Sequence, residues 1–313
     1  MRILVTGSSG FIGTALMSAL AANTRLHVRV AARRAGLVLP AGIELARIEA
    51  IGPDTRWNEA LAGIEVVIHL AARAHVLDEA LPDAHAEYRK VNTAGTLALA
   101  RQAAATGVRR FIFLSTVKVN GESTLPGHPF TVADTPAPVD PYAISKREAE
   151  DGLRAIAAGT GMEAVIIRPP LVYGPGVKGN FARLIAVIGQ GRWLPLGAID
   201  NRRSLVSVDN LVDLLLKCIN HTAAADQTLL VSDGEDLSTP ALIRCLSTAM
   251  GRPAHLLPMP VTLLKAGAVL TGRRAMMTRL IDSLQVDISA TRRLLDWTPP
   301  LSIDEGVRRI FRN

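Results

Sequence analysis

The first half of the chain alternates short apolar runs with longer amphipathic stretches. Five apolar runs have the length and composition of buried strands: residues 2–6, 27–32, 65–70, 110–115 and 163–168. Three stretches carry apolar side chains every three or four positions, as helices do: residues 11–22, 84–106 and 142–158. Strands that alternate with helices are joined by right-handed crossovers. The pattern therefore predicts an α/β fold with a doubly wound parallel sheet.

The alternation becomes irregular after Pro169, and Pro and Gly are frequent up to Gly197. Shorter elements are expected beyond this region: strands at 205–208 and 228–231, and helices at 209–219 and 238–250. These elements predict a smaller α/β lobe. We expect it to cap the carboxyl edge of the sheet, where doubly wound folds bind their ligands.

The charge of the chain raises the question of nucleic-acid binding. The net charge is +7, but the basic residues occur in pairs, such as Arg202-Arg203, with no run of five. Aromatic residues make up only 4% of the chain, too few for a platform on which bases stack. We therefore expect no nucleic-acid partner. Paired arginines also suit a small molecule that carries phosphate.

The cysteines and the apolar stretches bear on whether the protein binds a metal, is secreted or spans a membrane. Cys218 and Cys245 have no metal-like spacing, so we expect no metal site and a reduced, cytoplasmic protein. The chain enters a strand at once, which leaves no room for a signal peptide. The stretch 261–270 contains Lys265 and is too short to span a bilayer. We expect a helix docked on the core there, with a helix lying on a membrane surface as the alternative.

A glycine-rich turn links the first strand to the first helix. It reads Gly7-Ser8-Ser9-Gly10-Phe11-Ile12-Gly13. In this position one glycine permits the tight turn, one lets the backbone approach a pyrophosphate, and one lets the helix pack closely. The N-terminus of the helix offers free N–H groups to phosphates. We expect dinucleotide binding; a turn chosen for packing alone is the alternative.

The end of the second strand bears on the choice of cofactor. Sites for NAD often carry an acid there, which binds the adenosine ribose. This chain has Arg33 and Arg34 instead, and guanidinium groups suit a 2′-phosphate. The sequence therefore favours NADP, with NAD still open. The alternative is a solvated basic loop.

Tyr142 and Lys146 form the candidate acid/base pair. Four residues apart on a helix, they share one face. A nearby ammonium favours the phenolate and is expected to lower the pKa of Tyr142. Tyr142 can then exchange a proton with a substrate oxygen as hydride moves. Thr116, at the end of the 110–115 strand, is expected to hydrogen-bond the same oxygen, unless it serves only the local backbone.

Together these motifs resemble the extended short-chain dehydrogenase/reductase family, in its nucleotide-sugar epimerase/dehydratase branch. The resemblance covers nearly the whole chain, through TGSSGFIG, HLAA, VNTAGT, LSTVKVNG, YAISK, RPPLVYGPG and RRSLVSVDNLVD. It implies a Rossmann dinucleotide-binding domain at residues 1–168. Residues 169–313 would form mainly the substrate lobe, with a segment that returns to the sheet as an open alternative. The oligomeric state stays open, a homodimer included.

The resemblance also implies the ligand contacts. Besides Arg33 and Arg34, the expected cofactor-binding residues are Gly7, Gly10, Phe11, Ile12, Gly13, Leu70, Ala71, Ala72, Asn92, Ser115, Tyr142, Lys146 and Pro169. The substrate would be a UDP-sugar. Its expected contacts are Asn180, Arg203, and one or both of Arg274 and Arg279.

Three chemistries occur in this branch. Dehydratases carry Asp-Glu directly after the catalytic Thr, where this chain has Val117 and Lys118, so dehydration is disfavoured. The arginines after the second strand favour an NADP-dependent 4-ketoreductase. The VKVNGE segment resembles bacterial enzymes that reduce 4-keto-6-deoxy-N-acetylhexosamines to UDP-N-acetylquinovosamine-type sugars for surface polysaccharide. The alternatives are a UDP-hexose 4-epimerase that retains NAD, and a ketoreductase of the steroid or flavonoid type.

Overall fold

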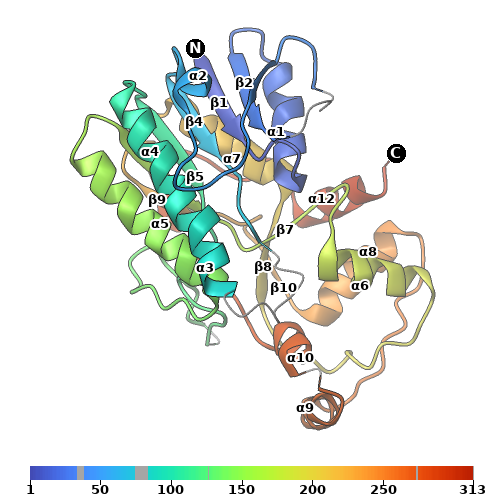
Figure 1. The fold of residues 1–313 in the computed structure, drawn as a ribbon. Helices are drawn as coiled ribbons and strands as arrows, with labels where there is room; N and C mark the ends of the chain where they lie inside the picture. The colour runs from blue at the N-terminus through green and yellow to red at the C-terminus, as the bar shows by residue number, and fades with distance from the viewer. Residues whose placement is uncertain (34–38, 75–83, 126, 273, 313) are drawn as a thin grey trace.

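The computed structural model describes residues 1–33, 39–74, 84–125, 127–272 and 274–312. Within these residues, seven strands form one sheet in the order β3-β2-β1-β4-β5-β6-β9, and every neighbouring pair is parallel (Figure 1). The strands are β1 (Arg2–Thr6), β2 (His27–Ala32), β3 (Glu44–Arg47), β4 (Val66–His69), β5 (Arg110–Leu114), β6 (Glu163–Arg168) and β9 (Thr228–Leu230). The predicted doubly wound parallel sheet is confirmed.

The sheet is covered on both faces, which explains why its central strands carry apolar side chains at successive positions. In β5, Phe111 and Phe113 pack into one core cluster, while Ile112 and Leu114 pack into another. The cluster of Phe111 lies under α4 (Thr96–Ala105) and α5 (Pro141–Ala158), with the short α2 (Asn58–Leu61) beside it. The cluster of Ile112 lies under α1 (Phe11–Ala21) and α7 (Val208–Asn220), with α11 (Ser289–Leu295) at its edge. Burial on two sides requires apolar side chains at successive positions.

The long helix expected at 84–106 is continuous but changes its winding. It begins as α3 (Ala84–Tyr88), continues as a π-helical segment (Arg89–Gly95), and ends as α4. Such wider turns are rare and are often found at functional sites. Asn92 lies in this segment and is buried.

A second, smaller sheet follows Pro169. Among the described residues it has the order β10-β8-β7, built from β7 (Leu171–Tyr173), β8 (Arg203–Ser207) and β10 (Asp236–Leu237). Its helices are α6 (Gly179–Gly189), α8 (Thr239–Ala249), α9 (Val261–Leu270), α10 (Arg274–Ile281) and α12 (Ile303–Ile310). Figure 1 shows α6 and α8 beside the smaller sheet, with α10 and then α9 below them. Strand β9 lies within this part of the sequence but pairs with β6 of the large sheet.

Within the described ranges, every helix is too short or too polar to cross a bilayer.

Candidate active site

The glycine-rich turn after β1 has no room for side chains at two of its glycines. Gly7 has φ of +77°, and a Cβ there would lie 2.6 Å from the backbone nitrogen of Ala71 at the end of β4. A Cβ at Gly13 would lie 2.1 Å from the carbonyl oxygen of Gly7. The turn therefore presses against the segment after β4, while α1 packs against the turn. Both contacts require glycine.

The residues of this turn fit the pyrophosphate of a dinucleotide. Gly10 precedes α1, and no side chain caps the N–H groups of the first turn of that helix. That turn also contains no acid, so the positive end of the helix dipole faces outward uncompensated. Among the described residues, the buried hydroxyl of Ser8 has no hydrogen-bond partner. An anion seated at the helix N-terminus would satisfy these donors.

His69, at the end of β4, holds the backbone beside the glycine turn. Its ring nitrogens lie 2.7 Å from Oγ1 of Thr6 and 3.0 Å from Oγ1 of Thr96. Burial, and then the positive charge of Lys146, lower the pKa of His69 to about 3, so the ring is neutral. Thr6 Oγ1 also accepts a hydrogen bond from the Ala71 N–H at 3.3 Å. The segment Leu70-Ala71-Ala72, expected to contact the cofactor, is therefore tied to β1.

The residues expected to choose between NAD and NADP lie at the end of β2. Arg33 is exposed, and it forms no ion pair within the described part of the chain. Its guanidinium is free to meet a ligand. Arg34 lies outside the described residues.

Lys146 is buried on α5 and is fixed to the end of β5. Its Nζ donates a hydrogen bond to the carbonyl oxygen of Leu114 at 2.6 Å. The same nitrogen lies 3.8 Å from the centre of the Phe113 ring, a cation–π contact. Burial lowers the pKa of Lys146 to about 7, although the carboxylate of Glu150 opposes the change. Lys146 thus joins the helix of the acid/base pair to the strand that ends at Thr116.

Tyr142 lies one helical turn before Lys146, at the start of α5. Asp140 accepts a hydrogen bond from the Ala143 N–H at 2.6 Å and fixes this end of the helix. The edge of the Tyr88 ring meets Tyr142, with ring centres 6.1 Å apart. Burial raises the pKa of Tyr142, and Asp140 and Tyr88 raise it further. The lowering expected from Lys146 is therefore not found in the protein alone.

Thr116 begins the tight turn Val117–Val119 that follows β5. Its Oγ1 accepts a hydrogen bond from the Lys118 N–H at 3.3 Å, which leaves its own hydroxyl proton to donate. Val117 is buried, and the ammonium of Lys118 pairs with Asp140 and Glu122. No carboxylate therefore occupies the two positions directly after Thr116, where an eliminating enzyme would need its acid and base.

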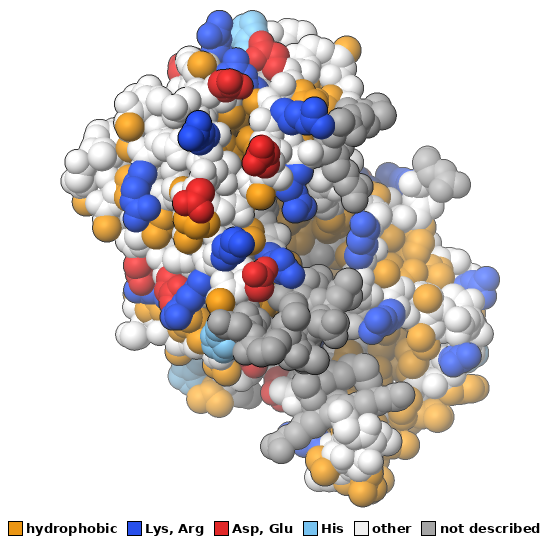
Figure 2. Space-filling view, viewed as in Figure 1, with side chains coloured by type: hydrophobic (Ala, Val, Ile, Leu, Met, Phe, Trp, Pro, Cys, Tyr) orange, Lys and Arg blue, Asp and Glu red, His pale blue; other side chains and the backbone are white. Residues whose placement is uncertain are grey.

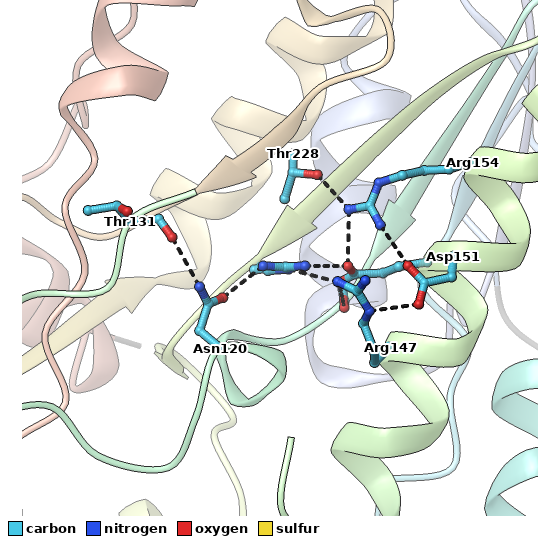
Figure 3. A network of polar contacts seen from close by, with 9 residues as sticks. Asn120, Thr131, Arg147, Asp151, Arg154 and Thr228 are labelled. Atoms are coloured by element: carbon cyan, nitrogen blue, oxygen red, sulfur yellow. Dashed lines mark hydrogen bonds and ion pairs between the residues drawn. The ribbon is translucent and has the colours of Figure 1, made fainter. Parts of the chain in front are cut away.

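A buried polar network that the sequence analysis missed supports the end of β5 (Figure 3). Arg168, the last residue of β6, donates to the Glu150 carboxylate through Nε at 2.9 Å. Ser115 donates to the same carboxylate, and Arg168 also donates to Oδ1 of Asn120 at 2.9 Å. Glu150 lies one turn after Lys146 on the same face of α5. That spacing is the only signal in the sequence that could have indicated it.

Asn92, expected to contact the cofactor, holds two neighbouring segments together. Its side chain accepts from the Arg73 N–H at 2.8 Å and donates to the Arg73 carbonyl at 3.1 Å. It also donates to Oγ of Ser145 on α5 at 3.0 Å. Pro169, another expected contact, accepts from the Val117 N–H at 2.9 Å and so lies beside the Thr116 turn.

Two of the expected substrate residues lie close together at the smaller sheet. Arg203, at the start of β8, donates to the carbonyl oxygen of Asp282 at 2.9 Å. Burial lowers the pKa of Arg203; the carboxylate of Asp282 opposes this, and the positive charge of Arg279 adds to it. Two mutually repelling cations favour the arrival of an anion such as a diphosphate.

The other two expected substrate residues, Asn180 and Arg274, lie at the starts of two helices of the C-terminal half. Asn180 is exposed near the start of α6, and among the described residues no hydrogen bond joins it to the arginines. Arg274 begins α10, but its side chain lies outside the described residues.

The sequence and the fold are both similar to those of known proteins. Residues 3–231 match the profile of the NAD dependent epimerase/dehydratase family. The chain is 47% identical to the UDP-glucose 4-epimerase of Vibrio cholerae, over 98% of this chain and 93% of that protein. It is 30% identical to the GDP-6-deoxy-D-mannose reductase of Pseudomonas aeruginosa, over 99% of this chain and 96% of the relative. Its fold is similar to that of the UDP-glucuronic acid 4-epimerase from Bacillus cereus in complex with NAD, with a TM-score of 0.77, 22% identity and coverage of 99% and 97%.

Proposed function

The chain belongs to the NAD dependent epimerase/dehydratase family, and from this premise we propose that it interconverts the C4 epimers of a UDP-linked hexose or N-acetylhexosamine. The observation that carries the proposal is 47% identity to a UDP-glucose 4-epimerase over nearly the whole chain. The residues of the site agree with it, because Thr116, Tyr142 and Lys146 supply acid/base chemistry and no eliminating carboxylate follows Thr116.

Tyr142 is the proposed acid and base. Its phenolate takes the proton of the C4 hydroxyl as the C4 hydrogen leaves as hydride, and the C4 carbonyl forms. The bound nicotinamide, when oxidised, supplies the hydride acceptor and a positive charge. In the return direction, with the opposite face of C4 presented, Tyr142 would give the proton back to the C4 oxygen. The hydride removed from C4 and the proton removed from its oxygen are both restored in the product, so the reaction consumes no external reductant.

The raised pKa of Tyr142 makes positive charge at the site essential. Burial and Asp140 favour the protonated phenol in the protein alone. A phenolate therefore requires cations close by, which the Lys146 ammonium and the bound cofactor would provide. Thr116 assists by donating a hydrogen bond from its hydroxyl to the C4 oxygen.

The smaller sheet is the proposed binding place of the UDP group. Arg203 and Arg279 would bind the diphosphate, with Asn180 and Arg274 as further contacts. In this proposal residues 1–168 hold the cofactor and residues 169–313 mainly hold the substrate. Pairing of β9 with β6 supports a contribution of the later segment to the large sheet. The free thiols of Cys218 and Cys245 support a reducing compartment such as the cytoplasm.

NAD is the proposed cofactor, since the family is defined by it. The second candidate function is an NADP-dependent 4-ketoreductase, which the sequence analysis favoured. One observation supports it: β2 ends without an acid and is followed by the exposed Arg33. The 30% identity to a reductase is compatible with it, but the higher identity to an epimerase favours the epimerase. A steroid-type substrate has less support, because it gives no role to the Arg203 and Arg279 pair.

A turnover assay without added cofactor tests the proposal. The purified protein is incubated with UDP-glucose or UDP-N-acetylglucosamine, and the anomeric proton signals of the sugars are followed by NMR. We expect the C4 epimer to accumulate to equilibrium, supported by cofactor that stays bound through purification. Absence of epimer, together with NADPH consumption on a 4-keto sugar nucleotide, would favour the reductase.

A further inference from the structure

Helix α9 exposes most of its apolar surface. Only Leu264 and Ala268 of Val261–Leu270 are buried, and these two anchor the helix. On the opposite side, the exposed fractions of Leu263 and Leu270 are 59% and 88%. Leu263, Ala266, Gly267 and Leu270 are exposed at the i, i+3, i+4 and i+7 positions of one stripe. The expected docking of this helix on the core thus accounts for only one of its faces.

Two further apolar side chains extend this surface. Leu257, just before α9, is 44% exposed, and its N–H donates to the carbonyl of Leu194. The neighbouring Trp193 is 61% exposed, and its ring centre lies 4.9 Å from that of His255. We call this surface the α9 patch and define it as Trp193, Leu257, Leu263, Val269 and Leu270. In Figure 2, some hydrophobic side chains are visible at the lower end of the molecule, where α9 lies, and more lie at the right, over the region of α6 and α8.

The segment 237–281, which contains α9, carries only positive charges. Residues 237–281 contain no Asp or Glu. They contain six basic residues: Arg244, Arg252, Lys265, Arg273, Arg274 and Arg279. This stretch alone carries +6 of the net charge of +7 of the whole chain. The rest of the chain is nearly neutral, so the basic character of the protein is concentrated in the segment that contains α9.

Helix α9 also lies at an end of the molecule. Figure 1 shows it below α10 and far from the large sheet, where a flat surface could reach it without touching the glycine turn. An exposed apolar helix with an exposed tryptophan nearby, in a segment with an excess of basic residues, has features of protein surfaces that lie in the interface of a bilayer.

We propose that the α9 patch docks on the surface of a lipid bilayer that contains anionic headgroups. The apolar stripe enters the boundary between headgroups and acyl chains, and the net positive charge of residues 237–281 attracts this part of the protein to the anionic headgroups. A symmetric contact with a second copy fits less well, because it would bring two acid-free, basic segments together. The docking does not depend on which reaction the enzyme catalyses.

Vesicle flotation with the full chain tests this docking. Phosphatidylcholine vesicles are compared with vesicles that also contain phosphatidylglycerol, at low and high salt. We expect binding only to the anionic vesicles, weakened by salt. Lys265→Glu should lower the partition coefficient by about tenfold or more, because each unit of charge contributes about fivefold. Leu263→Glu and Leu270→Glu should each lower it at least as far.

Two matched variants control for charge and folding. Arg25→Glu makes the charge change of Lys265→Glu at an exposed site outside the segment, and Leu45→Glu makes the change of Leu263→Glu and Leu270→Glu at an exposed leucine on β3. Both should bind as the unmodified protein does. No flotation with anionic vesicles, equal flotation with neutral ones, or equal losses in the control variants would overturn the proposal. So would a dimer that Leu270→Glu dissociates in sedimentation while no vesicle binding occurs.

Discussion

Glu150 and Arg168 form an ion pair in the interior of the protein, between the middle of α5 and the end of β6. Their side chains are 0% and 2% exposed, and Nε of Arg168 lies 2.9 Å from Oε1 of Glu150. Ser115, beside the proposed hydrogen-bond donor Thr116, donates to the same carboxylate. The pair therefore fixes the strand end that carries Thr116 relative to the helix that carries Tyr142 and Lys146.

Removing one partner of this pair should destabilise the fold strongly. Glu150→Ala leaves Arg168 as an uncompensated buried cation, which costs about 3–5 kcal/mol in the free energy of unfolding. The control is Asp151→Ala on the next position, where a half-exposed carboxylate pairs with Arg147 and Arg154 (Figure 3). That change should cost about 1 kcal/mol or less. Urea unfolding measures both, and equal losses would contradict a special role for the buried pair.

Tyr142→Phe should abolish catalysis and leave binding intact. Loss of one acid/base group typically lowers kcat by about 10²–10⁴-fold. The phenyl ring can keep its edge contact with Tyr88, so the melting temperature should change little. Steady-state kinetics and calorimetry with UDP measure the two effects separately. A variant that retained most of its kcat would remove Tyr142 from the mechanism.

Arg203→Ala should weaken substrate binding and spare the cofactor. Loss of a charge-assisted hydrogen bond of about 1.5–3 kcal/mol raises the KM for the UDP-sugar by about 10–100-fold. Arg202→Ala, on the exposed neighbouring position, is the control and should change KM little. A similar rise in both variants, or a fall in cofactor affinity with Arg203→Ala, would place the diphosphate elsewhere.

Arg33→Ala should lower the affinity for NADP without lowering that for NAD. We expect the exposed guanidinium to bind the 2′-phosphate that distinguishes the two cofactors, so the loss should be about tenfold or more. Fluorescence titration of cofactor-free protein with NADH and NADPH measures it. Arg25→Ala is the matched control. Unchanged NADPH affinity in Arg33→Ala would make this arginine part of a solvated loop.

The buried ammonium of Lys146 should make stability depend on pH. Its pKa is about 7 in the folded protein and 10.5 when unfolded, so between these values the unfolded chain binds more protons. The free energy of unfolding of cofactor-free protein should therefore rise from pH 7 to 8.5, by at most about 1.4 kcal/mol per pH unit. The raised pKa values of Cys218 and Cys245 act in the opposite direction, and mainly above that window, because the thiols of the unfolded chain ionise around pH 9.0. Lys146→Met should remove the slope, and a slope that persists would assign it to other groups.

The parts of this fold that could be predicted from the sequence are those that depend on local pattern. The central strands are buried on both faces and read as uninterrupted apolar runs, and Tyr142 and Lys146 lie on one helix four residues apart. Strand β3 was missed because Glu44–Arg47 is a largely exposed edge strand with little apolar pattern. Helix α6 was missed because it begins at Gly179 without a capping side chain. The π-helical turn at Arg89–Gly95 leaves no signal in the spacing of apolar residues.

The contacts between distant segments could not be predicted. Glu150 and Arg168 lie on different elements, and only the packing of α5 against β6 brings them together. Arg203 and Arg279 were each expected at the diphosphate, but their closeness depends on the segment around Asp282 that follows α10. The high pKa of Tyr142 likewise follows from burial and Asp140, which outweigh the local effect expected from Lys146.

The fate of the hydrogen on C4 tests the central claim most directly. UDP-glucose and UDP-N-acetylglucosamine, each with deuterium at C4, are incubated with the protein in ordinary water, with no cofactor added, and the products are analysed by NMR and mass spectrometry. We expect the C4 epimer of at least one of them to form and to keep its deuterium, because the hydride removed from one face of C4 would return to the other within the same site. A product that has lost the deuterium, or no epimer at all, would contradict it.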